Sequence, residues 1–362
     1  MTTPVLELDS LECGYGQQLI VNALSIHLRE GDIGCLLGPS GCGKTTTLRA
    51  IAGFEPISGG SILLDGKALS TAQHRVAPEQ RQIGMVFQDY ALFPHLRVDA
   101  NIAFGLRRGE QSIEALIARL GLTPLARKFP HELSGGECQR VALARAMAPK
   151  PRVLLMDEPF SSLDSRLRDD VRRHTLDFVR ETGTTTIIVT HDPDEAMRIA
   201  DRIALLDRGH LVQFDTPEAL YAHPTSLFAA EFFSNVTALS GVGQEGYLET
   251  RLGRFTAPGV SQGTRAIACI RPQHLKLVEA GTGVEGRVVT SEYRGDCRYV
   301  VVHIDGLESM LTVCVDSRET RSDDEFDAGA VVHLAADTGA VPVINENGIS
   351  SSSDQGRYVS QL

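Results

Sequence analysis

The sequence predicts a mostly parallel α/β domain that is followed by a small all-β barrel. Apolar strands, expected to be buried on both faces, alternate with helices along the first part of the chain, as in a parallel sheet covered by helices. Polar side chains stand directly after these strands, at the edge where such sheets bind ligands. Beyond about residue 235 the helical spacing gives way to short alternating strands with many turns, which indicates the barrel.

The domain boundaries follow from these changes of pattern. We expect an α/β domain at 1–235 with a helical subdomain at about 89–150, a β-barrel at 236–345, and a flexible tail at 346–362. Apolar runs predict strands at 33–37, 82–87, 153–157 and 186–190 in the first domain. Helical spacing and end signals predict helices at 45–52, 112–120 and 134–148. Alternation predicts strands at 266–272, 286–289, 299–304 and 331–334 in the second domain.

Composition disfavours several classes of protein. The chain has 362 residues and a formal net charge of −11, so its overall charge gives no support to a nucleic-acid partner. Its seven cysteines form no C-x-x-C or Cys/His cluster, which indicates reduced cytosolic thiols rather than disulfides or zinc. We recognise no signal peptide and no apolar run long enough to cross a bilayer. We therefore expect a protein that reaches a membrane by docking on another protein's helices.

One glycine-rich stretch organises the first domain. Residues 38–45 read G-x-x-x-x-G-K-T, the pattern of a phosphate-binding loop, between a predicted strand and a predicted helix. The glycines let backbone N–H groups converge on an anion at the helix N-terminus. Lys44 supplies a positive charge for the terminal phosphates, and the Thr45 hydroxyl is a ligand for Mg²⁺. The stretch resembles the loop of the P-loop NTPases, and this resemblance implies an α/β P-loop NTPase fold with a RecA-like core. The expected nucleotide contacts here are Gly38, Pro39, Ser40, Gly41, Cys42, Gly43, Lys44, Thr45 and Thr46.

Cys42 raises a separate expectation. It lies close to Lys44 and to a helix N-terminus, both of which lower the pKa of a thiol. A lowered pKa predicts that thiol alkylation inhibits the protein and that bound nucleotide protects it. The alternative is a small residue that fills its place in the loop.

Asp157 and Glu158 close the apolar strand at 153–157. Phosphoryl transfer needs a carboxylate to hold Mg²⁺ and a second group to align or deprotonate the attacking water. Adjacent acids at a strand end supply both, so we assign Asp157 to the metal and Glu158 to the water. The alternative, two solvated loop acids, is disfavoured by the apolar strand before them and by Pro159 after them.

A second motif occupies residues 133–137, Leu-Ser-Gly-Gly-Glu. Ser134 and Glu137 have the spacing of a capping box, and the two glycines leave the helix N-terminus open to an anion. These residues resemble the signature sequence of the ABC ATPases. The resemblance implies that Ser134, Gly135 and Gly136 contact the γ-phosphate of ATP held by the second subunit of a dimer. The family has Gln where this chain has Glu137, so we expect that carboxylate to cap the helix.

The resemblance covers about residues 5 to 235, because further motifs follow in the family's order. It implies that Tyr15 stacks on adenine, with an ordinary strand aromatic as the alternative. It also implies that Gln88 senses Mg²⁺ and the attacking water, that His191 contacts the γ-phosphate, and that Asp164 lies in a loop crossing the dimer interface. The implied cofactors are ATP and Mg²⁺. The implied catalytic residues are Glu158, His191, Gln88 and Lys44, and the implied metal ligands are Thr45, Gln88 and Asp157.

Two classes of ABC ATPase fit these motifs, a subunit of an importer and a soluble enzyme that acts on ribosomes or DNA. The second class normally has two fused ATPase halves or a long coiled-coil insertion, and this chain has neither. Residues 270–275 and the strand at 299–304 resemble the TOBE domain of importer ATPases. We therefore expect a peripheral subunit at the cytoplasmic face of the inner membrane. Its expected partners are a second copy of itself, permease subunits and, indirectly, a solute-binding protein, with no nucleic acid.

The expected substrate comes from residues 81–96, which look most like the ferric-iron importer ATPases. The ATPases of spermidine/putrescine, phosphonate, sulfate and sugar importers are close relatives, so these solutes remain alternatives. In the family, the segment after Gln88 receives the permease's coupling helix. Exposed apolar side chains at Leu92, Phe93 and Leu96 would suit that contact, and local packing is the alternative.

Overall fold

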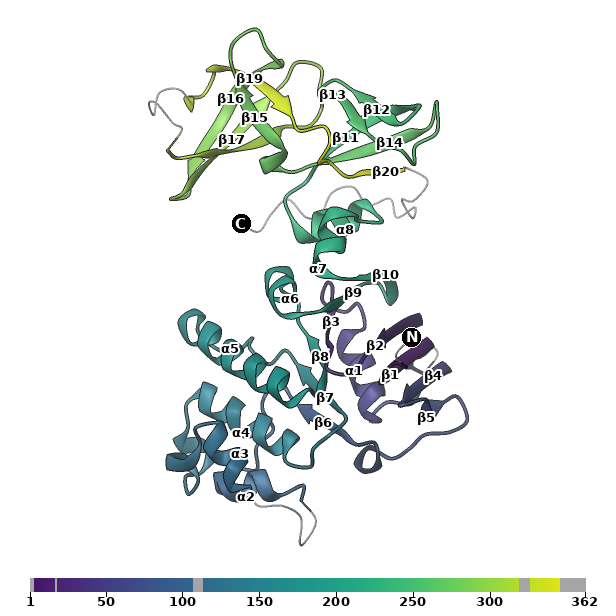
Figure 1. The fold of residues 1–362 in the computed structure, drawn as a ribbon, viewed down its shortest axis with the longest axis vertical. Coiled ribbons are helices and arrows are strands. Elements are labelled where there is room, and N and C mark those ends of the chain that lie inside the picture. Colours follow the sequence, from purple (N-terminus) through teal and green to yellow (C-terminus); the bar gives the residue numbers. More distant parts are fainter. Residues whose placement is uncertain (1–2, 17, 107–112, 319–325, 346–362) are drawn as a thin grey trace. The chain divides into compact units, whose positions relative to one another are not determined.

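The computed structural model describes residues 3–16, 18–106, 113–318 and 326–345 (Figure 1). The chain forms two compact units, residues 1–217 and 218–362. The flexible tail expected at 346–362 lies outside the described residues.

The first unit is built around a six-stranded sheet with the order β10-β9-β3-β8-β7-β6. Strands β9, β3, β8, β7 and β6 run parallel, and β10 joins antiparallel at one edge. Every residue of β3, β7 and β8 is buried, as the unbroken apolar runs predict. The strand bounds are β3 Ile33–Leu37, β6 Ile83–Val86, β7 Val153–Asp157, β8 Thr185–Val189, β9 Arg202–Asp207 and β10 His210–Asp215.

A second, antiparallel sheet in the same unit has the order β2-β1-β4-β5. Its inward side chains share one apolar core with α1 and the six-stranded sheet. The bounds are β1 Leu6–Tyr15, β2 Gln18–Leu28, β4 Gly59–Leu64 and β5 Lys67–Thr71. These alternating strands bring Tyr15 to the end of β1, at the turn into β2.

Helices cover the parallel sheet and form a separate group beside β6, where α2, α3 and α4 lie together (Figure 1). These helices fall within the range of about 89–150 for which a helical subdomain is expected, and the helix expected at 134–148 is α4. The helix expected at 112–120 is described as the shorter α3, and the strand expected to end at 87 ends at Val86. The bounds are α1 Lys44–Ala52, α2 Val98–Ala103, α3 Glu114–Arg119, α4 Gly135–Met147, α5 Ser165–Thr182 and α6 Pro193–Ile199. Short 3₁₀ turns occupy Pro78–Gln80, Thr123–Leu125, Pro130–Glu132 and Pro272–His274.

A fully buried arginine, Arg81, fastens the far end of α1, the helix that starts at the phosphate loop. Its guanidinium donates to the carbonyl oxygens of Ala50 and Ile51 in the last turn of that helix, at 3.1 and 2.9 Å. It also donates to Val76 O, Leu69 O and Ser70 Oγ. Burial lowers the pKa of Arg81 to about 10, so the side chain stays a cation at neutral pH. A cation here gives the carbonyl oxygen of Ile51 a donor, gives that of Ala50 a second donor beside the Gly53 N–H, and complements the helix dipole.

Replacing Arg81 with Met is therefore expected to lower the free energy of unfolding by about 3 kcal/mol or more, because the carbonyl oxygens of Ala50, Ile51 and Val76 each lose a hydrogen bond at once. Urea unfolding followed by circular dichroism measures the change. Arg127→Met, at an exposed arginine in the same unit, is the matched control and should change stability by less than about 0.5 kcal/mol. Equal stabilities of the two variants would contradict this role of Arg81.

The second unit contains two five-stranded antiparallel sheets, ordered β13-β12-β11-β14-β20 and β15-β19-β16-β17-β18. Side chains from both sheets, such as Phe255 and Val300, pack into one apolar core, as expected for a small all-β domain. The strand bounds are β11 Thr237–Gln244, β12 Tyr247–Thr250, β13 Gly253–Thr256, β14 Arg265–Ile270, β15 Leu275–Val278, β16 Val284–Tyr293, β17 Cys297–His303, β18 Leu311–Asp316, β19 Val331–Ala336 and β20 Val343–Asn345.

Two short helices, α7 (Pro217–Ala222) and α8 (Leu227–Phe233), explain why the units divide at 217/218 rather than at the expected residue 235. Buried Arg271, just after β14, donates from Nε to Ser234 Oγ at 2.7 Å, beyond the end of α8. Its Nη2 donates to Tyr221 O in α7 at 2.7 Å, and its guanidinium lies 3.7 Å from the centre of the Tyr221 ring. These contacts attach both helices to the β-rich unit.

Candidate active site

The loop between β3 and α1 has the geometry of a phosphate-binding loop. Gly38, Gly41 and Gly43 have φ angles of 146°, 81° and 103°, in the region that favours glycine. A Cβ on Gly38 would lie 2.2 Å from the carbonyl oxygen of Leu206, so that position admits no side chain. The backbone therefore turns tightly onto the N-terminus of α1. Ser40 and Gly41 are exposed at the tip of the loop, and Pro39 and Thr46 are half-buried.

Lys44 begins α1 with only 7% of its surface exposed. Its Nζ donates to the carbonyl oxygens of Gly38 and Pro39 at 2.6 and 2.9 Å. The ammonium group therefore lies inside the curve of the loop, and a phosphate entering the loop would meet a positive charge.

Thr45 and Asp157, which are far apart in the sequence, bring two oxygen atoms together that could bind a metal ion. The Thr45 hydroxyl donates to Asp157 Oδ1 at 3.3 Å, which joins the first turn of α1 to the end of β7. Burial raises the pKa of Asp157 above its ordinary value, and the hydrogen bond from Thr45 opposes that rise. A hydroxyl and a carboxylate are hard oxygen ligands of the kind that Mg²⁺ prefers, so this pair fits that ion.

Glu158 and His191 form a second pair at the same edge of the sheet. Glu158 Oε1 lies 3.2 Å from His191 Nδ1, and the side chains are 23% and 59% exposed. Glu158 has a φ of 44°, a left-handed conformation that is unfavourable for glutamate, and its N–H donates to Val189 O at 3.1 Å. A half-buried carboxylate held by a histidine in a strained turn is the arrangement of a positioned base.

Gln88 follows β6 at the sheet edge next to β7. The parallel register pairs Val86 with Met156, so the chain beyond Val86 runs alongside Asp157 and Glu158. The Gln88 side chain is exposed. The carboxyl ends of β3, β6, β7 and β8 thus bring the phosphate loop, Gln88, Asp157, Glu158 and His191 to one edge, as expected for a parallel sheet.

The motif at residues 133–137 forms the capping box that its spacing predicts. Glu137 Oε2 accepts hydrogen bonds from Ser134 N at 2.7 Å and Ser134 Oγ at 2.9 Å, and Glu137 N donates back to Ser134 Oγ. The hydrogen bond from the Ser134 N–H is the main reason that the pKa of Glu137 is lowered. Ser134 and Gly135 are exposed at the start of α4, whereas Gly136 packs against α5.

Tyr15, Asp164 and the motif that begins at Ser134 are not hydrogen-bonded to the residues of the phosphate loop in the described part of the chain. Asp164 is exposed and caps α5, accepting from Leu167 N at 3.0 Å. Tyr15 is 50% exposed, and its hydroxyl donates to Glu55 Oε1 at 3.1 Å. In the described part of the chain, no hydrogen bond or ion pair joins Tyr15, Asp164 or Ser134 to Lys44 or Asp157.

The expectation that the Cys42 thiol has a lowered pKa is wrong. Its Sγ lies 3.9 Å from Lys44 Nζ, as the sequence suggests, but the side chain is buried and only 3% exposed. Burial raises the pKa more than the ammonium group lowers it. The thiol packs under Gly38, where a Cβ would lie 2.9 Å from the sulfur. Cys42 is therefore a small filler of the loop, and the reason for expecting rapid alkylation disappears.

Comparison with known proteins identifies the family. Residues 21–161 match the model described as ABC transporter, and residues 268–344 match the TOBE domain. The chain is 38% identical to the Fe(3+) ions import ATP-binding protein FbpC 2 of Haemophilus influenzae over 320 residues, 84% of this chain and 90% of that protein. The chain belongs to the ATP-binding proteins of ABC transporters.

Two further comparisons agree with this assignment. The chain is 46% identical to the putrescine transport ATP-binding protein PotG of Escherichia coli over 250 residues, which cover 67% of this chain and 65% of PotG. The solved structure of cbiO1 from Clostridium perfringens, part of the ABC transporter complex cbiONQ, matches with a TM-score of 0.55 and 27% identity. That match covers 60% of this chain and 90% of cbiO1.

This ABC ATPase is thus the ATP-binding subunit of an importer. No helix in the described ranges has both the length and the apolar character needed to cross a membrane. The TOBE match falls within the β-rich unit, where the sequence analysis expects it.

Several residues of the site region are not apparent from the sequence motifs. Arg145 of α4 donates to Tyr90 O and Ala91 O, and the Tyr90 hydroxyl reaches Ser162. No local pattern indicates these partners, because 55 and 72 positions separate them.

Leu92, Phe93 and Leu96 are half-buried rather than exposed, and the Phe93 ring lies 4.2 Å from that of Phe104, so local packing accounts for part of this segment.

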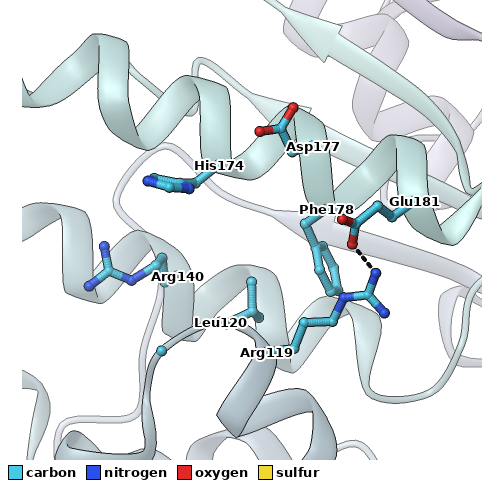
Figure 2. Close-up of a pocket in the computed structure, with 8 residues that line it drawn as sticks. Arg119, Leu120, Arg140, His174, Asp177, Phe178 and Glu181 are labelled. Carbon is cyan, nitrogen blue, oxygen red and sulfur yellow. Dashed lines mark hydrogen bonds and ion pairs between the residues drawn. The ribbon is translucent and has the colours of Figure 1, made fainter.

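The ABC ATPase also has a pocket between α3, α4 and α5, away from the phosphate loop (Figure 2). Its volume is about 690 Å³, and its charged side chains carry both signs. Arg119 pairs with Glu181 across one side, as the dashed line in Figure 2 marks. The pocket is lined by Arg119, Leu120, Gly121, Arg140, His174, Asp177, Phe178 and Glu181. None of these is an expected nucleotide contact, so the pocket is no part of the candidate active site.

Proposed function

We propose that this subunit hydrolyses ATP with Glu158 as the general base for the attacking water. The 3.2 Å contact between Glu158 Oε1 and His191 Nδ1 carries this proposal, because it orients a carboxylate at the sheet edge where the phosphate loop ends. Lys44 binds the terminal phosphates, His191 holds the base and contacts the γ-phosphate, and Gln88 aligns the water. Tyr15 stacks on adenine, since its ring is half-exposed.

The Thr45 hydroxyl and the Asp157 carboxylate, with Gln88, are the residues that would hold Mg²⁺. The distance of 3.3 Å between Thr45 Oγ1 and Asp157 Oδ1 supports the assignment of these two residues. Held there, the ion would supply positive charge that stabilises the negative charge developing on the phosphates during transfer. Because burial raises the pKa of Asp157, binding of the ion should weaken as the pH falls and the carboxyl takes up a proton.

Two copies of the chain complete each site in our proposal. Ser134, Gly135, Gly136 and Asp164 have no hydrogen bond to the phosphate loop of their own copy in the described residues. The exposed Ser134 and Gly135 start α4, whose free N–H groups and dipole suit the γ-phosphate of ATP held by the second copy. Hydrolysis then removes the charge that joins the subunits.

The transported solute is most simply ferric iron. The similarity to FbpC 2 supports this choice because it spans 90% of that protein and includes the TOBE region. A polyamine is the second candidate, supported by the higher identity to PotG over a shorter stretch. In either case the motor docks on its permease at the cytoplasmic face of the inner membrane, and a solute-binding protein delivers the solute.

Uptake in a strain that lacks this gene tests the proposal. Labelled ferric iron and labelled putrescine are supplied in parallel, and the strain is complemented with the wild type or with Glu158→Gln. We expect iron uptake to be lost in the deletion strain and restored by the wild type alone. Loss of putrescine uptake with normal iron uptake would replace the solute, and normal uptake of both would refute the two candidates together.

A further inference from the structure

The loop after Gln88 holds two consecutive residues in an unfavourable backbone conformation. Tyr90 and Ala91 have φ angles of 62° and 45°, in the left-handed region that non-glycine residues seldom adopt. Such a pair persists only when its surroundings hold it in place. The contacts that hold this loop therefore decide where Gln88 lies.

Arg145 of α4 provides one of these contacts. Its Nη1 donates to Ala91 O at 2.7 Å and its Nη2 to Tyr90 O at 2.9 Å. The same guanidinium lies 5.4 Å from the centre of the Phe93 ring, and burial lowers its pKa. The backbone of the loop is thereby tied to the helix that begins with the Ser134 motif.

The side chain of Tyr90 makes the second contact, with the loop that follows Glu158. The Tyr90 hydroxyl lies 2.6 Å from Ser162 Oγ, a hydrogen bond between two segments that are 72 residues apart in sequence. A Cβ built on Gly135 would lie 4.0 Å from the same hydroxyl and 3.3 Å from Leu163 Cδ2. The Tyr90 hydroxyl thus lies between the loop that follows Glu158 and the first residue of α4.

The loop that contains Ser162 is short and internally bonded. Ser161 donates to Glu158 O from both its N–H, at 3.3 Å, and its hydroxyl, at 2.9 Å. Arg168 donates to Leu163 O at 2.9 Å and holds the other end. A displacement of Ser162 would therefore move Glu158 as well, because the neighbouring Ser161 is hydrogen-bonded to Glu158 O.

We propose that Tyr90 is a positioning residue that couples the Gln88 loop to Glu158 through its hydrogen bond with Ser162. The inference rests on the proposed roles of Gln88 and Glu158 in hydrolysis. A partner that presses on the Gln88 loop moves Ser162 through this bond and so shifts the base relative to the water. Tyr90 itself touches neither ATP nor water in this scheme.

Tyr90→Phe tests the link because it removes only the hydroxyl. We expect kcat for ATP hydrolysis by the full-length chain to fall about three- to ten-fold, the worth of one hydrogen bond, with KM for ATP unchanged. Ser162→Ala should cause the same fall. The double variant should be no slower than either single variant, because both remove one shared bond. Tyr247→Phe, in the β-rich unit, is the matched control and should keep wild-type kcat and KM.

Two results would overturn the link. One is a wild-type kcat in Tyr90→Phe, and the other is a double variant whose loss is the product of the two single losses. Glu158→Gln is assayed beside them. If Glu158→Gln is inactive while Tyr90→Phe is fully active, the link fails and the assigned base stands. Wild-type turnover by Glu158→Gln would refute the base itself.

Discussion

Glu158→Gln should bind ATP with nearly wild-type affinity and hydrolyse it about 10²- to 10⁴-fold more slowly, the usual contribution of a general base. The amide has the size of the carboxylate and can still contact His191 Nδ1, 3.2 Å away, but it cannot accept the proton of water. The turn at Glu158 is set by the backbone, through its hydrogen bond to Val189 O, and should survive the change. Phosphate release gives the rate, and titration calorimetry gives the affinity.

Glu245→Gln is the matched control for this prediction, because that exposed glutamate lies in the β-rich unit. It should leave both the rate and the affinity unchanged. Turnover by Glu158→Gln at the wild-type rate would remove Glu158 from the role of base and leave His191 or Gln88 as the group to examine.

Lys44→Ala should weaken ATP binding about a hundred-fold or more. The buried ammonium group lies within 2.9 Å of two carbonyl oxygens of the loop, so its charge is already directed at the space that the phosphates would occupy. Two charge-assisted hydrogen bonds contribute about 1.5–3 kcal/mol each, and about 1.4 kcal/mol corresponds to a tenfold change in affinity. Titration calorimetry with ATP in the presence and absence of Mg²⁺ measures the loss.

Lys67→Ala removes an exposed lysine of β5 and controls for the general loss of positive charge. It should bind ATP as the wild type does. If Lys44→Ala retained wild-type affinity, the loop would bind phosphate through its backbone alone. The inward position of the ammonium group would then be a structural feature of the free loop.

The sequence was most informative where chemistry depends on residues that are close together in the chain. The phosphate loop, strand β7 with the Glu158 that follows it, and the capping box of Ser134 and Glu137 each form one local unit. Their backbone geometry follows from their own glycines and hydrogen bonds. The parallel order of the strands then explains why His191 meets Glu158, since both follow neighbouring strands of one sheet.

Features that depend on tertiary packing escaped prediction. Burial raises the pKa of Cys42 by more than Lys44 lowers it, and the sequence pattern does not indicate how deeply a loop residue is buried. Arg81 reads as an ordinary charged residue before a strand, although it is fully buried against the end of α1. The two units divide at 217/218 rather than at the expected residue 235 for the same reason. Arg271, which lies far along the chain, holds α7 and α8 in the second unit.

Sedimentation of Glu158→Gln tests the central claim, that two copies of this chain share their ATP, most directly. The full-length variant is examined with and without ATP and Mg²⁺, and Lys44→Ala is run under the same conditions. We expect ATP to double the mass of Glu158→Gln and to leave that of Lys44→Ala unchanged. A Glu158→Gln protein that binds ATP by calorimetry yet keeps a single, unchanged mass would contradict the shared site.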